Sequence, residues 1–269
     1  MQLQVNGDSV YVNTGGVELD ADKPSVVFIH GAAMDHSAWV LYARYLARHG
    51  CNALSIDLPG HGRSGGALLT SVEAMADWLP ALLDAAGIAR AALVGHSMGS
   101  LVALECAARH ADRISRIALL GCAFPMPVAE PLLAAARANQ QAAVDMVTLF
   151  GHGYAAQLGG NPVAGVNIQN LGMRLLEQAG DGVMYTGLSA CNAYAGGLDA
   201  AAKVRCPVAL IIGDSDQMTP PRAARELAAA LSAAGVEVHV ETLHDCGHMM
   251  MSEQPEMLHR ALLVALRGL

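Results

Sequence analysis

One stretch decides the fold of this 269-residue chain: residues 91–104, AALVGHSMGSLVAL. Its first four residues are a continuous apolar run, which is typical of a strand buried on both faces of a sheet. Gly95 and Gly99 then bracket Ser97, and the residues that follow favour a helix. A side chain at either glycine would clash with backbone in so sharp a turn. The pattern therefore predicts that Ser97 projects from a tight strand-to-helix turn.

This turn suits a nucleophile. A helix that begins at Met98 would aim its N-terminal N–H groups at an oxyanion forming beside Ser97. The alternative is the Gly-rich turn of a nucleotide-binding unit, but the Gly-x-Gly-x-x-Gly spacing is absent. A five-residue match to Gly-x-Ser-x-Gly arises by chance in many proteins. The prediction that Ser97 is a nucleophile therefore depends on the position of the motif between a predicted strand and a predicted helix.

Predicted strands and helices alternate on both sides of this unit. The first two strands, separated by a turn at Asn6-Gly7-Asp8, predict an antiparallel hairpin at a sheet edge. Helices between buried strands imply a parallel sheet with helices on both faces. We therefore predict an α/β fold with a mostly parallel eight-stranded sheet flanked by helices. The predicted strands are 3–5, 10–13, 26–29, 53–56, 91–94, 114–120, 208–212 and 236–240, and the predicted helices of the core are 37–49, 74–86, 101–109, 221–234 and 253–266.

Residues 123–202 interrupt this alternation after the sixth strand. They are rich in Ala, Gly, Asn, Gln and Met, and they favour short helices broken by glycines. So long a segment is not an ordinary connection, so we predict a helical cap, with residues 1–122 and 203–269 forming the core. Some cap side chains are candidates for lining a substrate pocket, although each could instead pack the cap's own core: Met126, Leu149, Tyr154, Tyr185 and Tyr194.

A serine nucleophile needs a base, and the base needs an orienting acid. His248 is the best candidate base, because it follows the last predicted strand and a glycine precedes it, and His244 is its rival. Asp216 follows the strand over 208–212 and is the candidate acid, with Asp214 as the alternative. Both aspartates could also be ordinary loop or capping residues, which is the commonest use of Asp in such turns.

Four motifs, in chain order, resemble those of the α/β-hydrolase superfamily: His30-Gly31, Asp57-Leu-Pro-Gly-His-Gly-Arg-Ser64, Gly95–Gly99, and the two loops of Asp216 and His248. The resemblance extends from the first predicted strand to the last helix. It implies the chain order nucleophile, acid, base that these residues follow. It also implies an acid three residues after the loop glycine Gly213, which favours Asp216 over Asp214.

The resemblance further implies an oxyanion hole. One donor would be the backbone N–H of Met98 and the other that of Ala32, with Ala33 as the alternative. Ala33 and Met249 are also candidates for contact with substrate. The stretch from Asp57 to Ser64 is expected to be structural, because two glycines and a proline make it a turn.

Departures from related patterns narrow the expected function to a serine carboxylesterase-like branch with a helical cap. Ser97 stands where dehalogenases and epoxide hydrolases have an aspartate, and Met249 stands where hydroxynitrile lyases have a lysine. We expect hydrolysis of small to medium carboxylic esters through an acyl-enzyme, without a cofactor. Four alternatives stay open: a cofactor-free haloperoxidase or perhydrolase, a carbon–carbon hydrolase, a lactonase, and a non-enzymatic receptor of the same fold.

Composition excludes several classes of partner. The 16 Lys and Arg residues against 24 Asp and Glu give a net charge of −8, and without a basic cluster neither nucleic acid nor a membrane surface is an expected partner. Six cysteines without a Cys-x-x-Cys pair, and no signal peptide, favour a cytoplasmic protein. The histidines lack His-Glu-x-x-His spacing, so no metal site is expected. The expected partner is a small ester, and the sequence leaves homo-oligomer formation open.

Overall fold

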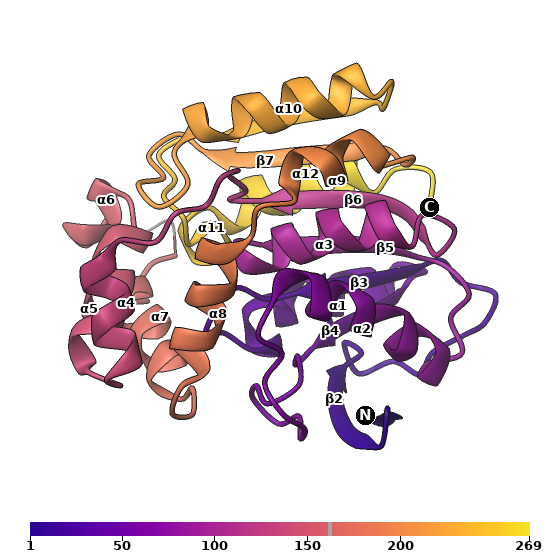
Figure 1. Cartoon of the computed structure of the whole chain (residues 1–269), viewed down its shortest axis with the longest axis horizontal. Helices are drawn as coiled ribbons and strands as arrows, with labels where there is room; N and C mark the ends of the chain where they lie inside the picture. Colours follow the sequence, from indigo (N-terminus) through magenta and orange to yellow (C-terminus); the bar gives the residue numbers. More distant parts are fainter. Residues whose placement is uncertain (161–162) are drawn as a thin grey trace.

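The computed structural model of the chain describes residues 1–160 and 163–269 (Figure 1). Eight strands form one sheet in the order β1-β2-β4-β3-β5-β6-β7-β8. The β1–β2 and β2–β4 pairs are antiparallel and the others are parallel, which confirms the predicted fold class. The strands are β1 (Gln2–Val5), β2 (Asp8–Asn13), β3 (Ser25–Ile29), β4 (Asn52–Ile56), β5 (Ala91–His96), β6 (Ile114–Leu120), β7 (Val208–Gly213) and β8 (Val238–Leu243).

Helices cover both faces of the sheet because its central strands are apolar on both sides. Val27 and Leu93 pack in a cluster with helices α2 (Val72–Ala85), α3 (Met98–Arg109) and α10 (Ala224–Ala233). Their chain neighbours Val26 and Val94 point the other way, toward α1 (Val40–Arg48) and α12 (Pro255–Ala265). This alternation is the period of two expected of a strand.

Within residues 123–160 and 163–202 the structure contains helices and no strand. The helices α4 to α8 lie together at one end of the sheet, on the left of Figure 1. They are α4 (Glu130–Arg137), α5 (Gln141–Gly151), α6 (Tyr154–Gln157), α7 (Ile168–Glu177) and α8 (Val183–Ala193). Helix α9 (Gly197–Lys203) packs instead on α3 and α10 of the core.

The cap helices share an apolar cluster with loops of the core. Leu132, Val147 and Leu188 from α4, α5 and α8 pack with Met34, which follows β3, and Met249, which follows β8. Through this cluster, helices α4 to α8 pack over the carboxyl ends of the parallel strands, which is where ligands bind in open α/β sheets. The division into a core and a cap over 123–202 stays a prediction.

Several element boundaries differ from the prediction. Strand β8 begins two residues later than expected, because Val236 N still donates to Leu231 O at the end of α10. The last predicted helix, over 253–266, is α12, which begins at Pro255 because proline has no N–H and suits the first position of a helix. A short helix before it, α11 (Met250–Glu253), was not predicted. Short 3₁₀ segments, η1 (His36–Trp39) and η2 (Pro221–Ala223), precede α1 and α10. Among the described residues, no helix has the length and apolar character to cross a bilayer.

Candidate active site

Ser97 occupies the sharp turn between β5 and α3. Its backbone angles are φ 53° and ψ −117°, a strained conformation for a residue with a side chain. A Cβ at Gly95 would lie 2.0 Å from the carbonyl oxygen of Gly99, and a Cβ at Gly99 would lie 2.4 Å from that of Ile29. Neither position can hold a larger residue without moving backbone. The turn that the two glycines predicted is therefore present, with the serine at its apex.

The loops after β7 and β8 bring the candidate acid and base together. Asp216 Oδ2 lies 2.8 Å from His248 Nδ1, and both side chains are buried. The other oxygen of Asp216 accepts hydrogen bonds from the backbone N–H groups of Met218 and Thr219, at 2.9 and 2.8 Å. The Thr219 hydroxyl donates to Asp216 Oδ2 at 2.6 Å, a contact that the sequence did not suggest. The carboxylate is thus held in one orientation against the ring.

These contacts keep Asp216 ionised. Burial raises the pKa of this carboxyl, but the neighbouring His248 and the hydrogen bonds from His248 and Thr219 outweigh burial and hold the pKa at about 2. The rival residues form a separate pair, with His244 Nδ1 3.3 Å from Asp214 Oδ2 on the exposed side of the loops. The structure therefore pairs Asp216 with His248 in the interior and Asp214 with His244 at the surface, and the roles of acid and base stay a prediction.

Ser97 and His248 line the same small pocket under the cap. Its volume is about 30 Å³, enough for one or two water molecules. Two residues expected near substrate, Ala32 and Met249, line this Ser97 pocket. Five apolar side chains that the prediction did not include also line it: Met34, Val147, Met184, Leu188 and Met218.

The other candidates for the pocket lie elsewhere. Leu149 and Tyr154 are 48% and 71% exposed on the outside of the cap. The Tyr194 hydroxyl donates to the buried carboxylate of Glu105, and the Tyr185 hydroxyl accepts from Arg137. Met126 is buried in the cluster of α2 and α3, and Ala33 is a buried turn residue with φ 59°. None of these six lines the Ser97 pocket. The sequence of a cap helix shows which residues are apolar, but the packing of the helix decides which of them face Ser97.

The two residues expected to form the oxyanion hole share a neighbour in the cap. A Cβ at Gly187 of α8 would lie 2.9 Å from Ala32 Cβ and 3.1 Å from Met98 Sδ. Gly31, directly before Ala32, lies against Ser97, since its Cβ would be 3.4 Å from Ser97 Cβ. The backbone at Ala32 and the start of α3 therefore meet beside the serine, and α8 packs closely over both.

Glu253 accepts hydrogen bonds from the residues on either side of His248. This buried carboxylate accepts hydrogen bonds from the backbone N–H groups of Gly247 and Met249, both at 3.1 Å. It also accepts one from Gly153 N of the cap at 2.8 Å. Met249 N in addition donates to Gly151 O at 2.9 Å, so the cap segment after α5 is tied to the histidine loop.

With His248 as the predicted base, we expect Glu253→Gln to lower the kcat for p-nitrophenyl acetate about tenfold while KM changes little, because a misplaced base weakens the chemical step more than binding. An amide offers one acceptor and a competing NH₂ to three N–H groups, so the free energy of unfolding should also fall by about 1–3 kcal/mol. Steady-state kinetics and urea denaturation check both. The matched control is Glu256→Gln, an exposed position on α12. A purely structural role would leave kcat at the wild-type value in the folded variant.

Two further histidines support the site in their neutral forms. His96 Nε2 donates to the backbone carbonyl oxygen of His248 at 2.8 Å, which ties β5 to the histidine loop. His30 donates through Nδ1 to Gly31 O at 2.8 Å and accepts through Nε2 from Leu58 N at 3.2 Å. Burial, and then a neighbouring histidine, lower the pKa of each to about 3.

These pKa shifts predict loss of stability in mild acid. In the unfolded chain both histidines take up protons below their ordinary pKa of 6.5, whereas in the fold they stay neutral down to about pH 3. Stability therefore falls as pH falls through this window, by about 2 kcal/mol for each histidine at pH 5 relative to pH 8. Urea denaturation at pH 8, 6 and 5 measures it. The His96→Gln variant should show a shallower fall than the wild type, and an equal fall would contradict the prediction.

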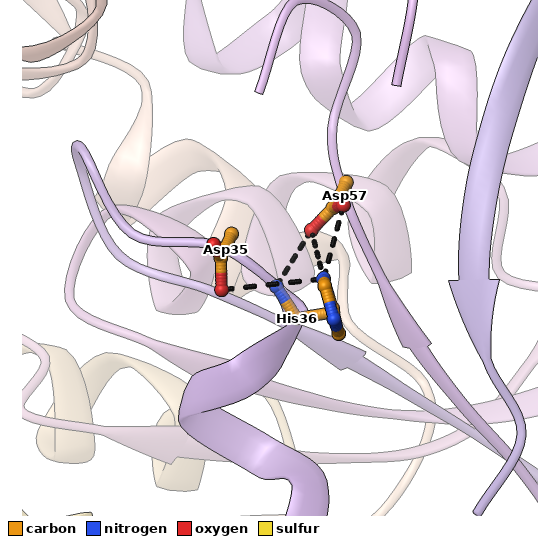
Figure 2. Close-up of side chains that lie close together, drawn as sticks. All are labelled: Asp35, His36 and Asp57. Atoms are coloured by element: carbon orange, nitrogen blue, oxygen red, sulfur yellow. Dashed lines mark hydrogen bonds and ion pairs between the residues drawn. The ribbon is translucent and has the colours of Figure 1, made fainter. Parts of the chain in front are cut away.

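Asp57 is the centre of a separate buried cluster (Figure 2). One of its oxygens accepts from His36 N at 2.6 Å, His36 Nδ1 lies 2.9 Å from the same oxygen, and the other oxygen accepts from Arg63 N at 2.9 Å. Asp35, His36 and Asp57 could in principle offer three ligand atoms to a metal ion. However, these hydrogen bonds already employ the Asp57 carboxylate, so the cluster is explained by its role in joining the loops after β3 and β4.

Comparison with known proteins identifies the family of the chain. A model of the alpha/beta hydrolase family matches residues 26–261. The chain is 32% identical over 252 residues to a pimeloyl-[acyl-carrier protein] methyl ester esterase of Aromatoleum aromaticum, covering 87% of this chain and 95% of that protein. It is 24% identical over 273 residues to an (E)-2-((N-methylformamido)methylene)succinate hydrolase of Acinetobacter baylyi, covering 97% and 95%.

A similar solved structure is that of an enol-lactonase from Burkholderia xenovorans, with a TM-score of 0.83 and 25% identity over 99% of both chains. The resemblance inferred from four motifs is therefore confirmed by the match over most of the chain, by related enzymes, and by a shared architecture. On these findings, the chain belongs to the alpha/beta hydrolase family.

Proposed function

We propose that this protein hydrolyses carboxylic esters through an acyl-enzyme intermediate on Ser97. The observation that carries the proposal is the buried 2.8 Å contact between Asp216 and His248, in loops that meet at the pocket lined by Ser97. A serine hydroxyl is a weak nucleophile, and an oriented imidazole beside it supplies the base that it lacks.

The proposed reaction follows from this geometry. His248 Nδ1 is engaged by Asp216, so Nε2 is the ring nitrogen left to accept the Ser97 proton as the hydroxyl attacks the ester carbonyl. Backbone N–H groups of Ala32 and Met98 stabilise the oxyanion, each by about 3 kcal/mol. His248 then protonates the leaving alcohol and later activates the water that releases the acid. Asp216 stabilises the imidazolium and fixes its orientation.

Relatives support ester chemistry. The Aromatoleum relative is named as a methyl ester esterase and aligns with most of this chain. A second candidate function is lactone hydrolysis, which the enol-lactonase structure favours because a lactone is a cyclic ester that the same three residues could open. Relative kcat/KM values for a p-nitrophenyl ester and a lactone of equal carbon number distinguish the two. A receptor function is disfavoured, since nucleophile, base and acid are all present.

The test of the proposal is hydrolysis of p-nitrophenyl acetate by the wild type and its loss in Ser97→Ala. Mass spectrometry after treatment with a phosphonate ester should place the adduct on Ser97. We also propose a cytoplasmic location, supported by six cysteines that are all free thiols. The proposed partner is a small-molecule ester, with neither nucleic acid nor a membrane surface as a partner.

A further inference from the structure

A second, larger apolar hollow lies on the surface between α1, α7 and α11. Its volume is about 400 Å³. Among the described residues, no charged side chain lines it. Two of its leucines are unusually exposed, Leu41 at 69% and Leu171 at 60%. Large exposed apolar surface of this kind marks binding sites. The side chains that line the apolar hollow include Met34, Leu41, Tyr42, Leu171, Leu175 and Met249.

The apolar hollow adjoins the Ser97 pocket. Met34 and Met249 line both, one on each chain segment that borders the serine. The Ser97 pocket alone, at about 30 Å³, is too small for a medium-length alkyl chain. The interior of the cap is already filled by the cluster that includes Leu132, Val147 and Leu188. An alkyl chain attached to the reacting carbonyl therefore has an apolar direction in which to extend, past the two methionines.

Methionine suits a boundary of this kind. Its unbranched side chain has three rotatable bonds and changes rotamer at little cost, so Met34 and Met249 can move apart for a chain and close behind it. The apolar hollow shares Leu41, Tyr42 and Pro255 with another hollow, whose lining also includes the charged or titratable side chains of Glu256, His259 and Arg260. The apolar path therefore has a limited length.

We infer that the apolar hollow binds an uncharged alkyl chain of the ester substrate, with Met34 and Met249 as the gate between the chain site and Ser97. The link to catalysis rests on the proposed ester hydrolysis. The substrate class is an ester with a medium-length alkyl chain and no charge along it. Because the path ends at charged groups, activity passes through a maximum with chain length and does not rise without limit.

The experiment compares the wild type with the double variant Leu41→Gln/Leu171→Gln. Both leucines are exposed, so the fold should survive, and an unchanged melting temperature checks this. The substrates are p-nitrophenyl acetate, which has no long alkyl chain, p-nitrophenyl octanoate, which has the chain in its acyl group, and octyl acetate, which has the chain in its alcohol group. Preference is the kcat/KM of an eight-carbon ester divided by that of p-nitrophenyl acetate. For one of the two eight-carbon esters we expect this ratio to be roughly tenfold lower in the double variant than in the wild type, because KM rises. The matched control is Leu263→Gln, an exposed leucine of α12 outside the apolar hollow, which should keep the wild-type preference.

A second measurement separates this inference from the proposed function. The fluorescent probe N-phenyl-1-naphthylamine should bind the wild type, be displaced by 1-octanol, and bind the double variant about tenfold more weakly. If the enzyme hydrolyses the esters and the double variant keeps the full chain preference, the inference is overturned. If no ester is hydrolysed, the proposed function fails, and probe binding alone tests the inference. Weaker probe binding by the double variant then supports the apolar hollow as an alkyl-chain site, and equal binding overturns the inference.

Discussion

Replacing Ser97 with alanine is expected to lower kcat for p-nitrophenyl acetate by a factor on the order of 10⁴–10⁶. The variant loses the oxygen atom that forms the acyl-enzyme, while the pocket and the buried Asp216–His248 pair remain. KM should change little, since the hydroxyl contributes chiefly to the transition state. Stopped-flow or steady-state release of p-nitrophenol measures the rate.

Stability measurements sharpen the same test. Alanine at φ 53° has the strain that serine has, so Ser97→Ala should unfold within about 0.5 kcal/mol of the wild type. Ser97→Gly should be more stable by up to about 1 kcal/mol, because glycine adopts this conformation freely. Ser71→Ala is the control: it removes the cap bond to Ala74 N, so it should cost about 1 kcal/mol of stability and leave kcat unchanged. Wild-type turnover by Ser97→Ala would show that another group attacks the ester.

Asp216→Asn is expected to lower kcat by about 10⁴. Asparagine can present its NH₂ to His248 Nδ1, which stabilises the ring with its proton on Nε2, the nitrogen that should accept the Ser97 proton. The exposed Asp214→Asn variant is the matched control and should stay within about threefold of the wild type, because Asp214 pairs with His244 away from the pocket. A large loss in the Asp214 variant with little loss in the Asp216 variant would reverse the assignment.

The pKa of Asp216 adds a stability signature. Its folded pKa of about 2 lies below the ordinary value of 3.8, so the ionised carboxylate stabilises the fold above pH 4. That contribution, about 2 kcal/mol, is lost as pH falls from 4 toward 2. The Asp216→Asn variant should therefore be less stable than the wild type at pH 7, and the difference should shrink in this acid range. A constant difference would argue against a charged contact.

Most of the sheet could be predicted because buried parallel strands carry their own signal. The runs at 26–29 and 91–94 are apolar at every position and lie within β3 and β5. Strand β8 was placed early because it is an edge strand with exposed and half-exposed residues, so its apolar pattern is weak. The break between α11 and α12 depends on Gln254 and Pro255, whose effect on a short helix the periodicity alone does not show.

Some residues of the candidate site could be predicted from the sequence and others could not. Ser97, Asp216 and His248 could be named from motifs, because each follows a strand and the carboxyl ends of parallel strands meet at one edge. Thr219 and Glu253 could not, since a threonine and a glutamate in a loop or short helix are common and only their buried hydrogen bonds distinguish them. Five cap residues proposed for the pocket lie outside it, because an Ala-rich helical segment does not reveal which helix face turns inward.

By itself, the sequence predicted the turn at Ser97 from the two glycines that bracket it, and the structure shows that neither Gly95 nor Gly99 has space for a side chain. The sequence also determined the order of the loops that carry Asp216 and His248. Only the tertiary structure brought Met34 and Met249 together as residues that line both the Ser97 pocket and the apolar hollow. The physical reason is range: a tight turn is set by atoms a few residues apart, whereas a pocket is the space left where helices and loops distant in the chain pack together.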